Sequence, residues 1–280
     1  MAVYSANVRV NTRADVHIPT VLAVGVVSFA AVTVVHEAVG HGVACVLAGG
    51  EALAVSSTEL RCDGPEGAAR LVVTAAGSVA NVAVGLAAIA VGIALGPARS
   101  IWAYVLWLFG ATNLFHAGCY MLIGPVASFG DWSHVARSLE PVPVWIIGIT
   151  ALGYGLNVAG SRLAGHPMWQ PLLGVDAEQR RTRMQLLTGL PLAAALVVSI
   201  AAGLLSPLQP RYALLTAVVA PFVLVLLIRL PAPPKSDQPA PPVVIAASWA
   251  WMAAGAIVGL GFVLILGPGL GSFEGYPIAR

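Results

Sequence analysis

The sequence predicts an all-α protein that crosses a lipid bilayer about seven times. Of its 280 residues, 58% are apolar and only 9% are charged, whereas a soluble domain carries roughly 25% charged residues. Each membrane span needs roughly 20 apolar residues, so the long apolar runs account for most of the chain. The same composition excludes intrinsic disorder and collagen. The net charge of +2 gives no reason to expect a nucleic-acid partner.

The predicted spans form a single transmembrane domain over residues 1–280. A polar tail at 1–17 precedes a core of three spans over 18–141, and four accessory spans follow over 142–280, with a polar loop at 161–185. The spans are expected at residues 18–50, 71–95, 101–124, 144–160, 186–208, 212–228 and 243–266. The core spans carry most of the polar residues that stand inside apolar runs.

Charges in the connections predict how the chain lies in the membrane. Residues 51–70 are charged and are expected to form a loop or a small hairpin, and residues 126–141 are expected to be interfacial or re-entrant. With seven spans, nine Lys and Arg residues fall on the side of the N-terminus and five on the opposite side. Because cytoplasmic loops carry an excess of Lys and Arg, we expect a cytoplasmic N-terminus, in a plasma membrane of bacterial type.

Three ionisable residues, His36, Glu37 and His41, stand inside the first apolar run. Ionisable residues at membrane depth are functional by default unless they are paired, because each costs a few kcal/mol there. Two neutral imidazoles bind Zn²⁺, and an adjacent carboxylate can serve as base towards a water that the metal activates. The cluster therefore predicts a metal site. A structural polar cluster in the bundle interior is the alternative.

The spacing of these histidines requires a local change in helix geometry. The helical zinc signature H-E-x-x-H places its histidines at i and i+4, about 40° apart, whereas i and i+5 are about 140° apart. A π-bulge adds one residue to a turn and would realign His36 with His41, and Gly40 is a permissive position for it. Alternatively, Glu37 and His41 face one ion together and His36 points elsewhere. The sequence leaves both arrangements open.

Three passages resemble the site-2 protease family of intramembrane zinc metalloproteases. The run from His36 to His41, an H-E-x-x-x-H variant, is similar to the family's H-E-x-G-H start with one residue inserted. Residues 75–81 (AAGSVAN) resemble its A-G-P-x-x-N element, with serine in place of proline. Residues 113–131 lie where the family places N-x-x-P-x-x-x-x-D-G, with Gly-Asp in place of Asp-Gly. The resemblance covers about residues 20–135.

The resemblance implies a fold, a ligand set and a reaction. His36, His41 and Asp131 would be the zinc ligands, and Glu37 would be the general base. Asn81 would lie on the substrate or oxyanion side. The implied reaction is hydrolysis of a peptide bond within or beside the membrane, so the implied substrate is a membrane-embedded peptide.

Further polar residues near this region keep other functions open. His116 lies within the third span, and His134 follows Asp131 by three residues, within reach of the same ion on a helix. Both histidines, with Asn81 and Asn113, are possible additional ligands or residues that support the ligands. Four histidines in one region raise the alternative of an iron or copper enzyme that oxidises or otherwise transforms a small lipophilic substrate. A non-catalytic metal-binding protein is the third hypothesis.

Two further sets of residues receive simpler interpretations. Cys45 and Cys119 lie in apolar runs, where cysteine is mostly a small hydrophobe. Cys62 lies in a connection, and the odd number of cysteines argues against a complete disulfide set. The arginines within residues 180–183 are expected to form a basic patch that faces anionic lipid.

Overall fold

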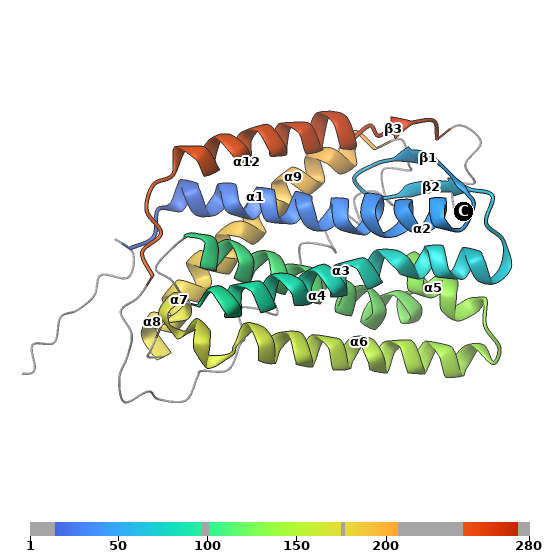
Figure 1. Ribbon diagram of the computed structural model, residues 1–280, viewed down its shortest axis with the longest axis horizontal. Helices are drawn as coiled ribbons and strands as arrows, with labels where there is room; N and C mark the ends of the chain where they lie inside the picture. Colours follow the sequence, from blue (N-terminus) through green and yellow to red (C-terminus); the bar gives the residue numbers. More distant parts are fainter. Residues whose placement is uncertain (1–14, 97–100, 175–176, 207–242, 274–280) are drawn as a thin grey trace, which may run out of the picture.

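The computed structural model describes residues 15–96, 101–174, 177–206 and 243–273. It is a bundle of long helices that run side by side, with one small sheet at one end (Figure 1). Within the described residues, six helices are long and apolar enough to cross a membrane. They are Ile18–Leu47, Gly67–Leu95, Ile101–Ala127, Val142–Ala164, Glu178–Leu204 and Trp249–Leu266. The predicted all-α membrane fold is thereby confirmed, and the span predicted at 212–228 lies outside the described residues.

The first span consists of three consecutive helical pieces. They are α1 (Ile18–Val34), the π-helix η1 (Val35–Gly42) and α2 (Val43–Leu47). Pro19 stands in the first turn of α1, where its missing N–H leaves no hydrogen bond unmade. The π-helix interrupts regular α geometry at the polar residues of this span. A change in backbone geometry therefore coincides with the candidate site.

A small sheet follows the first span, as the expected hairpin. Strands β1 (Glu51–Val55) and β2 (Leu60–Asp63) pair antiparallel, and β3 (Leu270–Gly271) adds to the other edge of β1. A disulfide joins Cys45, in α2, to Cys62, in β2. The interpretation of Cys45 as an unpaired hydrophobe was therefore wrong: the odd cysteine is Cys119, which is free and buried.

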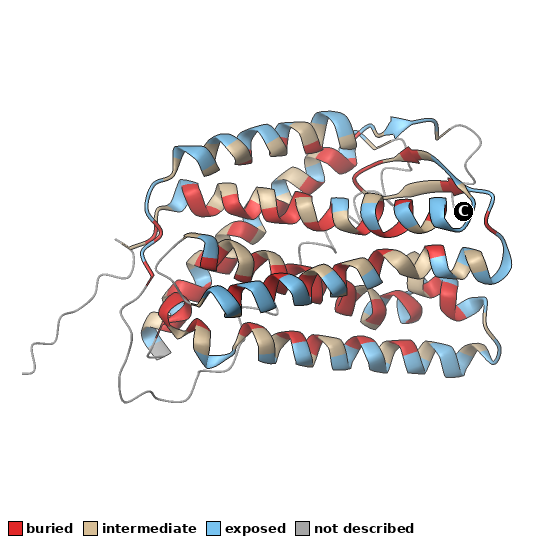
Figure 2. Ribbon diagram, viewed as in Figure 1, coloured by how far each residue is buried: buried red, intermediate tan, exposed pale blue. Residues whose placement is uncertain are grey.

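The next four helices form the centre of the bundle and position the site. They are α3 (Gly67–Leu95), α4 (Ile101–Ala127), α5 (Gly130–Arg137) and α6 (Val142–Ala164). Helix α4 packs between α3 and α6, and Figure 2 shows that buried residues concentrate on α4. The most apolar stretch of α4 is 72% buried, against 17% for that of α6, so α4 is a core helix and α6 lies at the outside of the bundle.

The segment predicted as a polar loop at 161–185 is largely helical. The elements that follow α6 are η2 (Pro167–Trp169), α7 (Gln170–Leu173), α8 (Ala177–Met184), the π-helix η3 (Gln185–Gly189), α9 (Leu190–Leu204), α12 (Trp249–Gly261) and the π-helix η4 (Phe262–Leu266). Arg180 and Arg183 are buried, which corrects the interpretation of this stretch as a basic patch facing lipid; only Arg181 of the three arginines is exposed. The short helices pack back onto the bundle because their apolar residues, among them Trp169 and Leu173, join its main core.

Candidate metal centre

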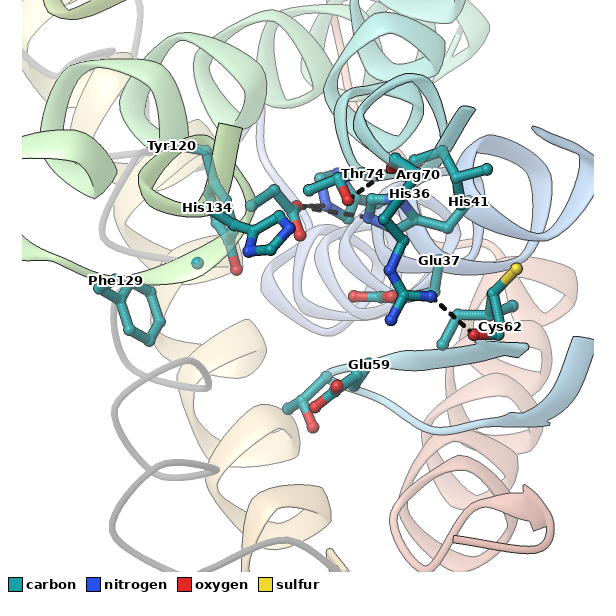
Figure 3. Close-up of a pocket in the computed structure, with 15 residues that line it drawn as sticks. His36, Glu37, His41, Glu59, Cys62, Arg70, Thr74, Tyr120, Phe129 and His134 are labelled. Atoms are coloured by element: carbon teal, nitrogen blue, oxygen red, sulfur yellow. Dashed lines mark hydrogen bonds and ion pairs between the residues drawn. The ribbon is translucent and has the colours of Figure 1, made fainter. Parts of the chain in front are cut away.

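Three side chains that are far apart in the sequence meet at the end of the bundle that carries the sheet. The Nε2 atoms of His36 and His41 lie 3.1 and 3.3 Å from Oδ2 of Asp131. One potential ligand atom from each residue lies within 4.8 Å of the others. Both histidines are buried, whereas the Asp131 side chain is 25% exposed. The cluster is therefore compact and reachable from one side (Figure 3).

The π-helix η1 is the reason that both histidines face the same point. On a regular α-helix, residues five apart diverge by about 140°, and the extra residue per turn of a π-helix reduces this divergence. In η1, the rings of His36 and His41 lie with their centroids 4.8 Å apart. Of the two arrangements that the sequence left open, the structure has the first, and Glu37 is not one of the three clustered donors.

Two glycines allow α3 to approach η1 closely enough to enclose the imidazoles. A Cβ atom on Gly77 would lie 2.5 Å from Nε2 of His41 and 2.7 Å from Nε2 of His36. A Cβ atom on Gly40 would lie 2.5 Å from the Cα of Gly77. All three distances are shorter than real Cβ contacts essentially ever are, so a side chain at either position would push the helices apart. The sequence signal for this contact was the small residues at 75–78, of the kind that lets membrane helices pack closely.

The second nitrogen of each clustered histidine is held by a hydrogen bond. Nδ1 of His36 lies 2.7 Å from Oδ1 of Asn81, and Nδ1 of His41 lies 2.8 Å from the carbonyl oxygen of Val73. Both partners are acceptors, so each Nδ1 carries a proton and donates, and each Nε2 is the nitrogen that faces Asp131. This is the arrangement in which metal-binding histidines are oriented by groups behind them.

Asn81 is a positioning residue, with its amide fully engaged. Its Nδ2 donates to the carbonyl of Val32 at 3.1 Å and to Oδ1 of Asn113 at 2.8 Å, while its Oδ1 accepts from His36. The resemblance implied a substrate-side or oxyanion-side role for Asn81; in the structure its Nδ2 donates twice within the bundle. Asn113 supports the orientation of Asn81 by accepting from its Nδ2. The Nδ2 of Asn113 itself donates to the Phe109 carbonyl.

The short helix α5 positions the carboxylate of Asp131 at the site. Asp131 lies in the first turn, where a negative charge is favoured by the helix dipole. Nε1 of Trp132 donates to Oγ of Ser78 at 2.8 Å and fastens α5 to α3. Burial raises the pKa of Asp131, but the nearby charges and hydrogen bonds of His41 and His36 outweigh burial and hold the pKa well below its ordinary value.

The other predicted histidines lie nearby without joining the cluster. His134 is exposed and lines the cavity beside Asp131. His116 is buried, with its ring centroid 5.0 Å from that of His36. Sequence reasoning missed Tyr120, which stacks on His116 at 4.8 Å and lies 5.3 Å from His36. Its position one helical turn after His116 was the signal that could have found it.

An open cavity of about 240 Å³ lies beside the cluster. The candidate base Glu37 lines it, together with Glu59 from the hairpin, Arg70 from the start of α3, and Tyr120 (Figure 3). Nη1 of Arg70 donates to the carbonyl of Cys62 at 2.9 Å, which holds the guanidinium against the hairpin. The sequence predicts a loop or a small hairpin at residues 51–70, but nothing in it predicts that this hairpin folds back over the site.

The donor set fits a zinc ion. Two imidazole nitrogens and one carboxylate oxygen are a ligand set that catalytic zinc sites use, with a fourth position left for water or substrate. The hydrogen-bonded Nδ1 atoms and the cavity meet the other requirements of such a site. In comparisons with known proteins, no family model, no curated protein and no solved structure matches this chain.

Proposed function

We propose that the protein is a zinc-dependent membrane hydrolase that resembles the site-2 proteases and cleaves a membrane-embedded peptide. The observation that carries the proposal is the convergence of His36, His41 and Asp131 on one point, with Glu37 lining the adjoining cavity. A buried carboxylate that is next to a donor set but outside it has the placement expected of a general base.

Each residue of the chain has a distinct role in this proposal. His36, His41 and Asp131 would hold the ion, which supplies the acidity that activates water and polarises the scissile carbonyl. Glu37 takes a proton from the attacking water and passes it to the leaving nitrogen. Asn81 keeps Nε2 of His36 aimed at the site.

The surroundings of the site support a substrate that approaches along the membrane. The donors belong to helices that are long and apolar enough to span the bilayer, or lie directly after one. The cavity opens beside the hairpin, where Glu59 and Arg70 provide charges of both signs. An extended peptide segment that leaves a membrane helix presents backbone amides that such polar walls can bind.

Substitution of Glu37 by glutamine tests the proposed base. Purified protein is incubated in detergent with a set of fluorescent transmembrane peptides in water enriched in oxygen-18, and new carboxyl termini are identified by mass spectrometry. We expect wild-type protein to produce labelled termini and Glu37→Gln to lose the activity by at least about 100-fold, the lower range for a general base. Glu51→Gln, an exposed change on β1, is the matched control. Equal activity in Glu37→Gln would refute the assignment.

Metal analysis distinguishes zinc-dependent hydrolysis from the iron or copper enzyme, and activity of Glu37→Gln distinguishes it from a non-catalytic metal-binding protein. The iron or copper alternative rests on four histidines in one region, and only two of them belong to the clustered donors among the described residues. A non-catalytic metal-binding protein would keep the ligands and tolerate Glu37→Gln.

We further propose that the N-terminus is cytoplasmic and that the metal-site end of the bundle faces an oxidising compartment. The excess of Lys and Arg on the N-terminal side supports this orientation. The disulfide between Cys45 and Cys62 lies at the metal-site end, and disulfides persist in oxidising compartments such as the periplasm.

Labelling in intact bacterial cells tests the orientation. Single cysteines introduced at Glu140, near the metal-site end, and at Arg162, at the other end, are exposed to a membrane-impermeant maleimide. Both side chains are exposed in the structure. We expect Glu140→Cys to be labelled and Arg162→Cys to react only after the cells are permeabilised; the reverse pattern would overturn the orientation.

A further inference from the structure

A second, smaller cavity lies on the inner side of the candidate metal centre. We call it the inner cavity; its volume is about 20 Å³. Its walls come from α1, η1, the turn between β1 and β2, α4, α9 and η4. His36, Glu37 and Tyr120 line both this cavity and the larger one. The inner cavity therefore adjoins the candidate site directly.

Three polar atoms on the wall of the inner cavity have no hydrogen-bond partner within the part of the chain that the structure describes. They are Nδ1 of His116, Oγ of Ser57 and Oγ of Ser199. The residues are 3%, 9% and 3% exposed. Buried polar groups in proteins nearly always have a partner, and one left unsatisfied costs about 1–3 kcal/mol. Three such groups around one cavity point to a ligand that satisfies them together.

Two other buried hydroxyls, those of Thr33 and Thr188, do not share this feature. Thr33 also lines the inner cavity, but its Oγ1 donates to the Phe29 carbonyl. Thr188 donates in the same way to the Met184 carbonyl. Such bonds to the preceding turn are the usual way in which a helix satisfies a hydroxyl. Ser199 makes no such bond, so its hydroxyl is available to the cavity.

We propose that the inner cavity is a binding site for one ordered water molecule beside Glu37. A water needs a cavity of roughly 10–15 Å³ and two to four polar partners. The inner cavity has about 20 Å³ and offers His116, Ser57 and Ser199. Phe29 and Phe262 form the apolar part of its lining.

The use of this water rests on the proposed function, whereas its binding does not. Hydrolysis consumes one water per cleaved bond, and Glu37 lines both cavities. A water in the inner cavity is thus a second water next to the base.

Hydroxyl-radical footprinting with short X-ray pulses tests the water site, because radicals form from bound water and oxidise the side chains beside it. In wild-type protein we expect oxidation at His116 and Phe262, although each is only 3% exposed. Phe115 and Trp107 are 0% exposed and line neither cavity, so they are internal references that stay unmodified. Equal modification of the two pairs would overturn the proposal.

A filled cavity is the second arm of the test. Ser199→Val removes the hydroxyl and extends methyl groups into the cavity, so oxidation of His116 and Phe262 should fall several-fold, and Ser199→Ala should lower it less. Thr188→Val, a buried hydroxyl with its own helical partner, is the matched control. Unchanged oxidation in Ser199→Val would also overturn the proposal.

Metal content separates this proposal from the proposed function. The footprinting is repeated on zinc-loaded protein and on protein treated with a chelator, and zinc is measured in each variant. Oxidation of His116 and Phe262 in protein that binds no zinc would support the water site while the hydrolase proposal fails. Zinc binding without that oxidation would show the reverse.

Discussion

The two ends of the helix bundle both bury ionisable side chains, but they do so in different ways. At the metal-site end, His36, His41 and Asp131 converge beside a cavity of about 240 Å³. At the other end, Arg183 is 0% exposed, and its Nε and Nη2 donate to the carbonyls of Leu172 and Val243, each at 2.6 Å. Arg183 lines neither cavity. Buried ionisable side chains indicate a binding site where their ligand atoms converge beside a cavity. Where no cavity adjoins them and they donate to backbone carbonyls, as Arg183 does, they hold distant segments of the chain together.

The comparison predicts that variants at the two ends separate metal affinity from stability. Changes among the clustered donors should remove zinc and leave the bundle folded. Changes at Arg183 should loosen the bundle and leave zinc affinity unchanged.

Loss of a donor should have the largest effect. His41→Ala removes one of three clustered ligand atoms, so we expect zinc affinity to fall by more than the roughly 10–100-fold cost of losing a supporting group. Competition with a fluorescent chelator measures the change. His166→Ala is the control, because His166 is exposed at the other end and accepts a bond from the Met168 amide. Wild-type affinity in His41→Ala would remove His41 from the ligand set.

A methyl group at Gly77 should have the next largest effect. In Gly77→Ala the added Cβ overlaps Nε2 of both histidines, so α3 or the rings must move. We expect zinc binding to weaken by about 100-fold, the upper end for displaced ligand support. Gly148→Ala on α6, where a Cβ meets nothing within 4 Å, should bind zinc normally. An unaffected Gly77→Ala would show that the close approach is not required.

Loss of the hydrogen bond behind His36 should have a smaller effect. Asn81→Ala removes the acceptor of the Nδ1 proton, and we expect zinc affinity to fall by about tenfold, the lower end for such support. Asn113→Ala removes a partner of the Asn81 amide but leaves the acceptor of the His36 proton in place, so it should lower the affinity less. If Asn113→Ala costs as much as Asn81→Ala, Asn81 does not act through its bond to His36.

The variant at the other end should not affect zinc. Arg183→Met leaves the carbonyls of Leu172 and Val243 without their donor, so we expect the free energy of unfolding to fall by about 2 kcal/mol or more. Thermal denaturation in detergent, with zinc titrated into the folded protein, measures both quantities. A large loss of zinc affinity in folded Arg183→Met would mean that the two ends are coupled.

The membrane fold and the polar cluster could be predicted because a lipid bilayer restricts the backbone conformations and side chains that can cross it. Backbone groups in lipid must be satisfied within a helix, so long apolar runs predict spans such as Gly67–Leu95 closely. The five-residue spacing of His36 and His41 led to the π-bulge as one of two arrangements, because a regular α-helix does not bring both rings to one ion. Asp131 entered through the resemblance, and its Oδ2 lies 3.1 and 3.3 Å from Nε2 of His36 and His41.

The rest depends on contacts between distant segments, for which local sequence carries no signal. The pairing of Cys45 with Cys62 requires the hairpin to fold back onto α2. Arg70, at the start of α3, lines the cavity because it donates to the Cys62 carbonyl of the folded hairpin. The arginines at 180–183 form a polar run by sequence, and only the packing of α7 and α8 buries two of them.

Elemental analysis of the purified protein tests the central claim most directly. Wild-type protein and Glu37→Gln are prepared without chelators, and zinc, iron and copper are measured per chain. Because Glu37 is not among the clustered donors, the account predicts about one zinc per chain in both proteins, as for a catalytic zinc site with three protein ligands. Protein without metal, or with iron or copper in place of zinc, would contradict it.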